Sequence, residues 1–307
     1  MNDRAKAALN KLGALPGMFA IKNQVEQMIQ FSKISKLRTR HGLKALPQSN
    51  HMIFTGNPGT GKTTAARLIG EAFAALGMLK TSQDEPPFVE IHHADVTHPH
   101  VGQAERTLKA KFKEARGGVL FIDEAYAFVA GESSHMTGDK VIAAIVQLME
   151  DMRDEIVVIA AGYPENMDEF LDENPGLRSR FPTTIHFPDY EVSDLVQIAA
   201  FLCAEREYKM SKSYVDVLAA KLWEEKRKPG FGNARTIRNI IEQSIRMQSV
   251  RVAQLPAPSR EELILLTEYD MSAPVTTKSE KEMLLQSIES LHKRLKEIER
   301  REILYGR

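Results

Sequence analysis

A glycine-rich segment between an apolar run and an apolar-periodic stretch holds residues that could bind phosphate. It reads Gly56, Asn57, Pro58, Gly59, Thr60, Gly61, Lys62, Thr63, Thr64. Its glycines permit backbone angles that other residues avoid, so successive N–H groups can point at phosphate oxygens. The helix expected after them adds free N–H groups and a positive dipole end. Lys62 would reach the β- and γ-phosphates of a nucleotide, and the Thr63 hydroxyl would take a Mg²⁺ position. The pattern predicts a nucleoside triphosphate site.

Two adjacent carboxylates, Asp123 and Glu124, follow the apolar run VLFI. The carboxyl end of a buried strand is where a parallel sheet gathers its ligand chemistry. We expect Asp123 to hold Mg²⁺ through water and Glu124 to act as general base toward the attacking water. The pair favours hydrolysis over phosphate transfer to a small molecule. No guanine-reading string of the NKxD type is evident downstream, so ATP is preferred to GTP.

Short apolar runs that alternate with amphipathic stretches must position these residues. The runs are residues 51–56, 88–93, 118–123, 156–162 and 183–187. This alternation predicts a five-stranded parallel sheet of the P-loop α/β class, sandwiched by helices. After residue 190 the strand signals stop, and the chain reads as helices only to about Asp270, which predicts a second, all-helical domain. From Lys278 a heptad pattern predicts a C-terminal helix, either packed on that domain or used for oligomerisation and docking.

Composition limits the classes of partner and compartment. The 307 residues include 41 basic and 41 acidic side chains, so no global field recruits nucleic acid or an anionic membrane, and we expect neither partner. The single cysteine, Cys203, is expected to be a buried, inert thiol, which fits a reducing cytoplasm. No segment is apolar enough to span a bilayer, and we see no signal peptide. The sequence thus favours a cytoplasmic protein.

Five segments resemble the AAA+ ATPase superfamily, and within it the CbbX/SpoVK type. They are GNPGTGKTT, GGVLFIDEAY, VVIAAGYPENM, NPGLRSRFPTTIHFPDY and GFGNART. The resemblance implies a homo-hexameric ring that uses ATP hydrolysis to remodel a partner protein, with nucleotide between a large α/β subdomain and a small helical lid. We accordingly divide the chain into an N-terminal helical linker region, a nucleotide-binding subdomain, a lid and the heptad helix, at residues 1–50, 51–190, 191–272 and 273–307.

The resemblance also assigns roles outside the glycine-rich segment. Arg180 looks like the arginine finger that completes a neighbouring subunit's site, with Arg178 as a second candidate. Arg235 resembles the lid arginine called sensor 2, at the start of a helix that Asn233 could cap. Tyr163 stands where many AAA+ proteins carry asparagine, and its hydroxyl either orients the attacking water or packs.

The N-terminal segment LPGMFAIK contains Gly17 and Met18. It resembles the family's N-terminal linker, whose apolar residues lie against the adenine. The resemblance therefore adds Gly17 and Met18 to the nucleotide-binding residues.

A cluster of histidines in IHHADVTHPHV has three interpretations. By resemblance, the loop after the second strand projects into the ring's central pore, and His100 takes the place of the usual gripping aromatic, with His98 beside it. The histidines could instead only cap or pack. A metal site is the third interpretation, but His92 and His93 alternate across a strand and cannot both point the same way.

Two other functions remain open at the sequence level. The same core could serve a nucleic-acid motor or loader, or a nucleotide-switched scaffold that docks through its C-terminal helix. The sequence does not choose among a sporulation, Rubisco-related or secretion role, and it does not name the partner.

Overall fold

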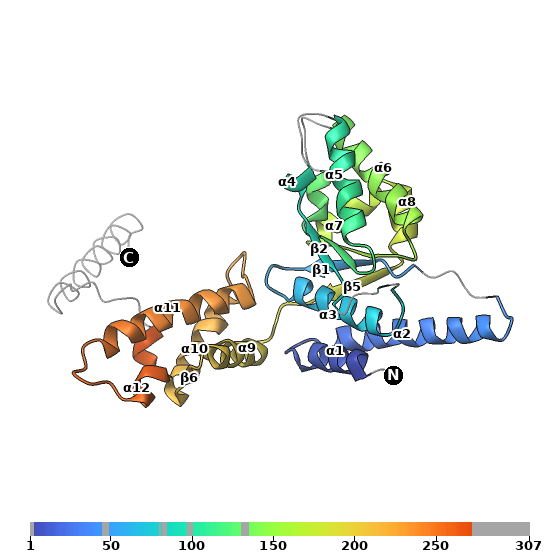
Figure 1. Ribbon diagram of the computed structural model, residues 1–307. Helices are drawn as coiled ribbons and strands as arrows, with labels where there is room; N and C mark the ends of the chain where they lie inside the picture. The colour runs from blue at the N-terminus through green and yellow to red at the C-terminus, as the bar shows by residue number, and fades with distance from the viewer. Residues whose placement is uncertain are drawn as a thin grey trace, which may run out of the picture. The chain divides into compact units, whose positions relative to one another are not determined.

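The computed structural model describes residues 3–44, 49–79, 81, 85–96, 101–129 and 135–271. Its central element is a five-stranded sheet with the order β2-β3-β4-β1-β5, in which every neighbouring pair is parallel (Figure 1). The sheet confirms the predicted fold class. The strands are β1 (Met52–Gly56), β2 (Phe88–Ile91), β3 (Val119–Ile122), β4 (Val157–Gly162) and β5 (Thr183–Phe187).

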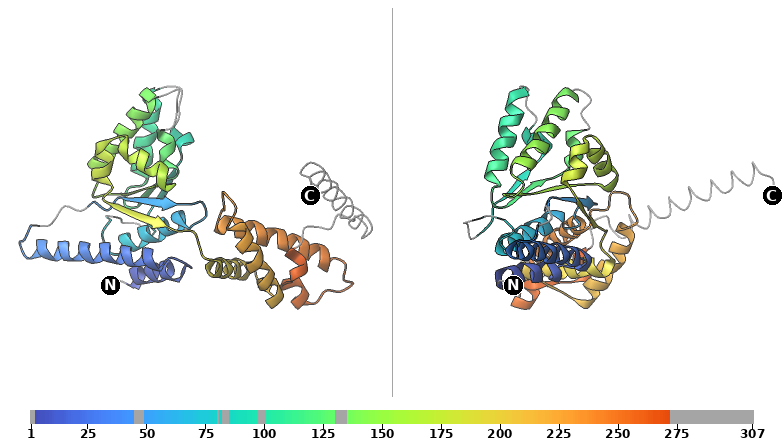
Figure 2. Two further views of the ribbon diagram at one scale, coloured as in Figure 1. Left: turned by 180° about the vertical axis from the view of Figure 1, so that it is seen from behind. Right: turned by 90° about the vertical axis from the view of Figure 1, so that its right-hand side faces the viewer.

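Helices cover both faces of this sheet (Figures 1 and 2). One face packs against a layer built from α5 (Val101–Glu114), α6 (His135–Asp151), α7 (Pro164–Asp172) and α8 (Pro175–Arg180). On the other face lies α3 (Lys62–Ala75), against which α1 (Asp3–Ala14) packs, while α2 (Phe19–Arg40) contacts β5. Alternation along each strand explains the two layers: Ile53 belongs to the first core, and its neighbour Phe54 points to the opposite face.

The segment between β2 and α5 differs from the expected strand. β2 ends at Ile91, and residues His93–Val96 form the single-turn helix α4. Asp95 explains this early end, because its carboxylate accepts a hydrogen bond from the His92 N–H at 2.8 Å and so closes a turn. A second short helix, η1 (Ala125–Phe128), follows β3.

After β5, the described chain to Met271 is mainly helical, as predicted, but it also contains a short parallel strand pair. The helices are α9 (Val192–Glu205), α10 (Lys212–Glu225), α11 (Ala234–Val252), α12 (Arg260–Ile264) and η2 (Glu268–Met271), and the strands are β6 (Lys209–Met210) and β7 (Leu265–Leu266). Strands of two residues are too short to show an alternating pattern, which explains why the sequence did not indicate them.

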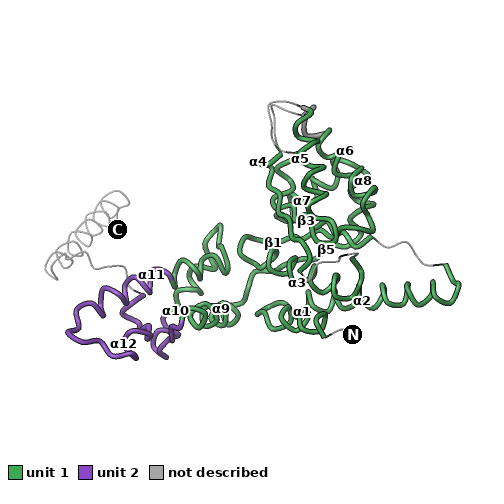
Figure 3. The backbone as a smooth tube through the Cα atoms, viewed as in Figure 1, with its two compact units in different colours: residues 1–206, 218–241 green, residues 207–217, 242–307 purple. Residues whose placement is uncertain are grey.

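The chain forms two compact units (Figure 3). The first contains residues 1–206 and 218–241, and the second contains residues 207–217 and 242–307. Within the second unit, Arg251 donates to both oxygens of the fully buried Asp270 carboxylate, each at 2.8 Å, and the Tyr214 hydroxyl donates to Ser244 Oγ at 2.9 Å. The subdomain boundaries drawn from the sequence stay predictions, and the predicted heptad helix lies outside the described residues.

The cysteine has the environment expected from the sequence. Cys203 is buried in α9, and burial raises the pKa of its thiol to about 11, so the thiol stays protonated near neutral pH. Among the described residues, no helix has the length and apolar character needed to cross a membrane.

Candidate nucleotide site

The glycine-rich loop, residues 56–63, connects the end of β1 to the start of α3. Gly59 and Gly61 have φ angles of 73° and 89°, in the left-handed region that favours glycine. Space is equally limiting: a Cβ at Gly56 would lie 2.3 Å from the Phe187 carbonyl oxygen, and one at Gly59 would lie 2.1 Å from the Gly232 carbonyl oxygen. Both the backbone angles and the close approach of neighbouring backbone therefore require glycine here.

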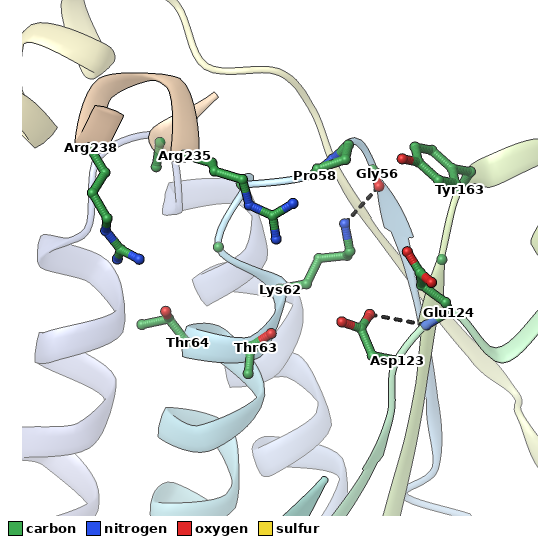
Figure 4. Close-up of a pocket in the computed structure, with 14 residues that line it drawn as sticks. Gly56, Pro58, Lys62, Thr63, Thr64, Asp123, Glu124, Tyr163, Arg235 and Arg238 are labelled. Carbon is green, nitrogen blue, oxygen red and sulfur yellow. Dashed lines mark hydrogen bonds between the residues drawn. The ribbon is translucent and has the colours of Figure 1, made fainter. Parts of the chain in front are cut away.

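A cavity of about 370 Å³ lies over this loop, within the first unit (Figure 4). Its lining comes from four parts of the chain, namely the loop with the first turn of α3, the end of β3, the end of β4 and the start of α11. The lining residues are Gly56, Pro58, Gly59, Gly61, Lys62, Thr63, Thr64, Asp123, Glu124, Gly162, Tyr163, Ala234, Arg235 and Arg238. The fold thus brings the predicted phosphate loop, acidic pair and lid arginine to one cavity.

Lys62 is the cation at the centre of the loop. Its ammonium group donates to the carbonyl oxygens of Gly56 at 2.7 Å and Asn57 at 2.9 Å. Burial lowers the pKa of Lys62, and the charge of Arg235 also lowers it, while the nearby Asp123 carboxylate opposes the shift. The lysine is therefore held by neutral acceptors, and a phosphate oxygen would be a stronger, charge-assisted partner.

The acidic pair lies at the carboxyl end of β3, as predicted. Asp123 accepts a hydrogen bond from the Glu124 N–H at 3.1 Å. Glu124 has a φ of 50°, a left-handed conformation that is uncommon for a residue with a side chain. In Figure 4 the Glu124 side chain lies between Asp123 and Tyr163. Two adjacent residues of one chain therefore both present their carboxylates to the cavity.

Tyr163 lies at the position before α7, directly after β4. Its side chain lines the cavity, and its ring centroid is 6.0 Å from that of Tyr126. The tyrosine thus packs against a neighbouring ring and also lines the cavity, and a role of its hydroxyl in orienting the attacking water stays a prediction.

Two arginines reach the cavity from the first turn and a half of α11. Arg235 was predicted from the sequence, whereas Arg238 was not. Residues three apart lie on the same face of a helix, so the spacing of the two arginines was a signal that could have identified Arg238. The site therefore holds two guanidinium groups besides Lys62.

Four of the predicted binding residues do not line the cavity, namely Asn57 and Thr60 of the loop itself and Gly17 and Met18 near the N-terminus. Asn57 donates through Nδ2 to both oxygens of Asp189 at 3.0 Å, and Thr60 Oγ1 donates to the Asn57 carbonyl oxygen at 2.8 Å. Met18 packs against the loop, since a Cβ at Gly61 would lie 2.5 Å from the Met18 methyl carbon, whereas a Cβ at Gly17 would lie 2.9 Å from a ring carbon of Tyr190. The contact of Gly17 and Met18 with adenine stays a prediction.

The two candidate finger arginines, on α8, do not line the cavity of their own chain. Arg178 forms an ion pair with Asp172 at 2.6 Å. The Arg180 side chain is less exposed than that of Arg178. It forms an ion pair with Glu150 at 3.4 Å and donates to the Gly176 carbonyl oxygen at 3.2 Å. Its buried Nε has no hydrogen-bond partner within the described chain. A residue that completes a neighbouring subunit's site must be absent from its own, so this placement is compatible with either candidate.

The predicted pore residues His98 and His100 lie outside the described residues. Of their neighbours, His92 lies with Nε2 3.8 Å from a Glu90 carboxylate oxygen, and the His93 ring packs edge-on against Phe128 at 5.3 Å. Among the described side chains, no group of three or more histidines, cysteines or carboxylates could hold a metal ion. The pore, capping and metal interpretations of the loop histidines all stay untested.

Two family models match consecutive parts of the chain. Residues 52–189 match the ATPase family associated with various cellular activities (AAA), and residues 191–282 match the AAA lid domain. The first match contains the phosphate loop and the acidic pair, and the second contains Arg235 and Arg238.

Proteins with related sequences match over most of their length. Stage V sporulation protein K of Bacillus subtilis (strain 168) is 37% identical over 265 residues, which cover 85% of this chain and 81% of that protein. The chloroplastic ribulose bisphosphate carboxylase/oxygenase activase of Cyanidioschyzon merolae (strain NIES-3377 / 10D) is 32% identical over 257 residues, which cover 84% of each chain.

A solved structure of similar fold is that of the FIGL-1 AAA domain, with a TM-score of 0.58 and 17% sequence identity over 85% of this chain and 80% of that one. At this identity the match supports the fold alone.

Proposed function

Because the chain belongs to the AAA ATPase family, in its CbbX/SpoVK type, and is an ATPase, we propose that it assembles into a homo-hexameric ring that remodels a partner protein. The observation that carries the proposal is the single cavity that gathers the phosphate loop, the acidic pair and two lid arginines. Such a constellation can bind a triphosphate, hydrolyse it and report its state to the helical part of the chain.

The cavity suits ATP with Mg²⁺. Among the described residues, the Lys62 ammonium is held by two neutral carbonyl oxygens, and a cavity of about 370 Å³ lies over the loop. The Thr63 hydroxyl and the Asp123 carboxylate line the same cavity and are oxygen ligands of the kind that Mg²⁺ prefers. When bound, the ion would neutralise charge that develops on the phosphates.

Glu124 is the proposed general base. Its carboxylate would take a proton from the attacking water, and the left-handed backbone at this residue turns the side chain beside Asp123. The Tyr163 hydroxyl is close enough to the same cavity to help orient that water. Arg235 and Arg238 would contact the phosphates from the lid side, so binding would also be sensed by α11.

The ring and its partner are the finer parts of the proposal. An arginine from α8, Arg180 or else Arg178, would complete the site of the adjacent subunit. One relative is named as an activase of ribulose bisphosphate carboxylase/oxygenase, which favours a protein substrate for this chain too. The loop with His98 and His100 would contact that substrate in the pore. We place the protein in the cytoplasm.

Two substitutions test the site. We expect Lys62→Ala to weaken ATP binding by roughly 100-fold, because it removes a charged donor to phosphate.

We expect Glu124→Gln to bind ATP within a few-fold of wild type but to lower kcat by roughly 10²- to 10⁴-fold, because it removes only the base. Calorimetric titration and phosphate release measure the two effects, and wild-type turnover by Glu124→Gln would show that the base is misassigned.

The ATP-locked Glu124→Gln protein also gives access to the partner. A chain that binds ATP without hydrolysis should hold its substrate protein longer than wild type does. We expect affinity purification of this variant to retain a protein that Lys62→Ala does not retain, and identification of that protein by mass spectrometry would name the substrate. ATPase stimulation by DNA or RNA, with no retained protein, would instead favour a nucleic-acid motor.

A further inference from the structure

Two carbonyl groups of the phosphate loop accept hydrogen bonds from the first residue of α11 and from the residue before it. The Pro58 carbonyl oxygen accepts from the side-chain Nδ2 of Asn233 at 3.3 Å, and the Gly59 carbonyl oxygen accepts from the backbone N–H of Ala234 at 3.1 Å. Arg235, which lines the cavity, is the next residue. The segment that carries the lid arginine is therefore bonded directly to the loop.

A third carbonyl is held by Tyr190. The Tyr190 hydroxyl donates to the Thr60 carbonyl oxygen at 3.0 Å, and the Tyr190 side chain is buried. Its backbone N–H donates to Oδ1 of Asn233 at 3.0 Å. Tyr190 thus connects the loop to the same asparagine that holds the Pro58 carbonyl.

Asn233 is the centre of this network. Its side chain is fully buried, and its amide uses both donors, one to Pro58 and one to Asp189 Oδ1 at 2.8 Å, while its oxygen accepts from Tyr190. Asp189 also accepts from Asn57 of the loop. The sequence had suggested Asn233 as a helix cap, but the structure turns its side chain toward the loop, with φ at 48°. A buried amide with three partners cannot rotate without losing hydrogen bonds.

Peptide geometry gives this network a functional consequence. In a planar trans peptide the carbonyl of one residue and the N–H of the next point in opposite directions. The bonds to the carbonyls of residues 58, 59 and 60 therefore direct the N–H groups of Gly59, Thr60 and Gly61 away from Asn233 and Tyr190. Within the described chain the N–H groups of Gly59 and Gly61 have no protein acceptor, so they remain available to phosphate oxygens, whereas the turn at Pro58 and Gly59 directs the Thr60 N–H toward the Asn57 carbonyl oxygen.

We propose that Asn233, held by Asp189 and Tyr190, is a positioning residue that orients the peptide groups of the phosphate loop and couples this orientation to the segment carrying Arg235. The inference rests on the nucleotide site proposed above. It adds that the phosphate loop depends for its shape on a residue far away in the sequence, at the start of α11.

The sharpest test is Asn233→Asp. This substitution keeps the size of the side chain, its Oδ1 acceptor and its tolerance of a left-handed backbone, but it replaces the Nδ2 donor with an oxygen that faces the Asp189 carboxylate. We expect the dissociation constants of MgATP and MgADP to rise roughly 10- to 100-fold. AMP lacks the β- and γ-phosphates that the loop binds, so its dissociation constant should change by less than about threefold. Calorimetric titration with the three nucleotides measures this.

Three further variants separate positioning from folding. Asn233→Gly keeps the left-handed conformation but removes the amide, and it should show the same dependence on phosphate number. Tyr190→Phe removes only the hydroxyl bonded to Thr60 and should weaken MgADP binding by roughly fivefold. Tyr214→Phe is the matched control, because it deletes a buried tyrosine hydroxyl bonded to Ser244 in the second unit, and it should leave nucleotide affinity unchanged.

The outcomes distinguish this inference from the function on which it rests. Wild-type MgADP affinity in Asn233→Asp, or an equal loss for AMP and ATP, would overturn the positioning role. Wild-type affinity in Lys62→Ala would instead overturn the nucleotide site itself. Thermal unfolding identifies any variant that fails to fold. If an Asn233 variant fails to fold, the MgADP affinity of Tyr190→Phe tests the positioning role in its place.

Discussion

At the scale of single residues, the site contains a lysine without a charged partner among the described residues and a glutamate with a strained backbone. Among the described residues, the Lys62 ammonium donates only to carbonyl oxygens, and Glu124 holds a left-handed backbone that costs about 1–2 kcal/mol. Such arrangements persist only where the surrounding structure enforces them. A phosphate oxygen would give the Lys62 ammonium the charged partner that it lacks among the described residues.

The burial of His51 predicts that the free energy of unfolding falls in acid. The ring is buried at the start of the sheet, its Nδ1 accepts a hydrogen bond from the Val158 N–H at 3.0 Å, and burial lowers its pKa from 6.5 to about 4. Above pH 6.5 the ring is neutral in both folded and unfolded chains. Between pH 6.5 and 4 only the unfolded chain takes up the proton, so acid destabilises the fold by up to about 3 kcal/mol through this residue.

Chemical denaturation at pH 7 and pH 4.5 measures that effect. The control is His51→Asn, which keeps an acceptor for the Val158 N–H but cannot titrate. We expect wild type to lose more unfolding free energy than the variant between the two pH values. Equal losses would mean that the histidine is protonated in the folded protein at a higher pH than its burial indicates.

At the scale of elements, the phosphate loop is shaped by three segments that surround it: the end of β5, the residues after it, and the start of α11. Gly59 is the position where this packing is tightest. Its Cα faces the Gly232 carbonyl oxygen so closely that no side chain fits between the two backbones. The loop and the start of α11 are therefore packed together, so a change in the backbone of one must shift the backbone of the other.

Gly59→Ala should consequently abolish nucleotide binding. Gly42→Ala is its matched control, because Gly42 has a φ of 72° against 73° for Gly59, yet a Cβ on Gly42 would meet no heavy atom of the described residues within 4 Å beyond its own chain neighbours. We expect both variants to lose about 1–2 kcal/mol of stability to a left-handed alanine, and Gly59→Ala to lose more because its Cβ would lie 2.1 Å from the Gly232 carbonyl oxygen. Only Gly59→Ala should also lose MgADP affinity in calorimetric titration. Comparable affinity in both variants would show that the contact with Gly232 is not needed.

At the scale of the whole molecule, the proposed ring requires each site to be shared between two subunits. Arg180 is held near the surface of its own subunit by Glu150 and Gly176, away from its own cavity. Its guanidinium therefore has a defined position from which to serve a neighbour. Arg178, which pairs with Asp172, is the alternative donor.

A mixing experiment tests this sharing. We expect Arg180→Ala to bind ATP but to lower kcat by roughly 10³-fold, because the γ-phosphate loses its cation. Glu124→Gln is inactive for a different reason, so mixing the two inactive proteins should restore part of the ATPase activity at sites that combine Glu124 of one chain with Arg180 of the other. The finger would be Arg178 if ATPase activity did not recover in the mixture of Glu124→Gln with Arg180→Ala but did recover in the mixture of Glu124→Gln with Arg178→Ala.

Much of the candidate site was predictable because its signals are local. One loop contains the glycines, Lys62 and Thr63, and one apolar strand precedes Asp123 and Glu124. A few neighbouring residues therefore carry each signal. Parallel strands gather their carboxyl ends at one edge, which is why five alternating runs were enough to place these pieces together. Arg238 was missed, although its helical spacing from Arg235 was visible.

By itself, the sequence determined the α/β class, the phosphate loop, the acidic pair and the ATPase family. Only the tertiary structure decided which distant residues shape that loop, because hydrogen bonds between Asn233, Tyr190, Asp189 and the loop carbonyls join segments with no common sequence pattern. It also decided that Asn57 and Thr60 turn away from the cavity, and that β6 pairs with β7. These features depend on the direction of individual donors and acceptors, which periodicity and spacing do not encode.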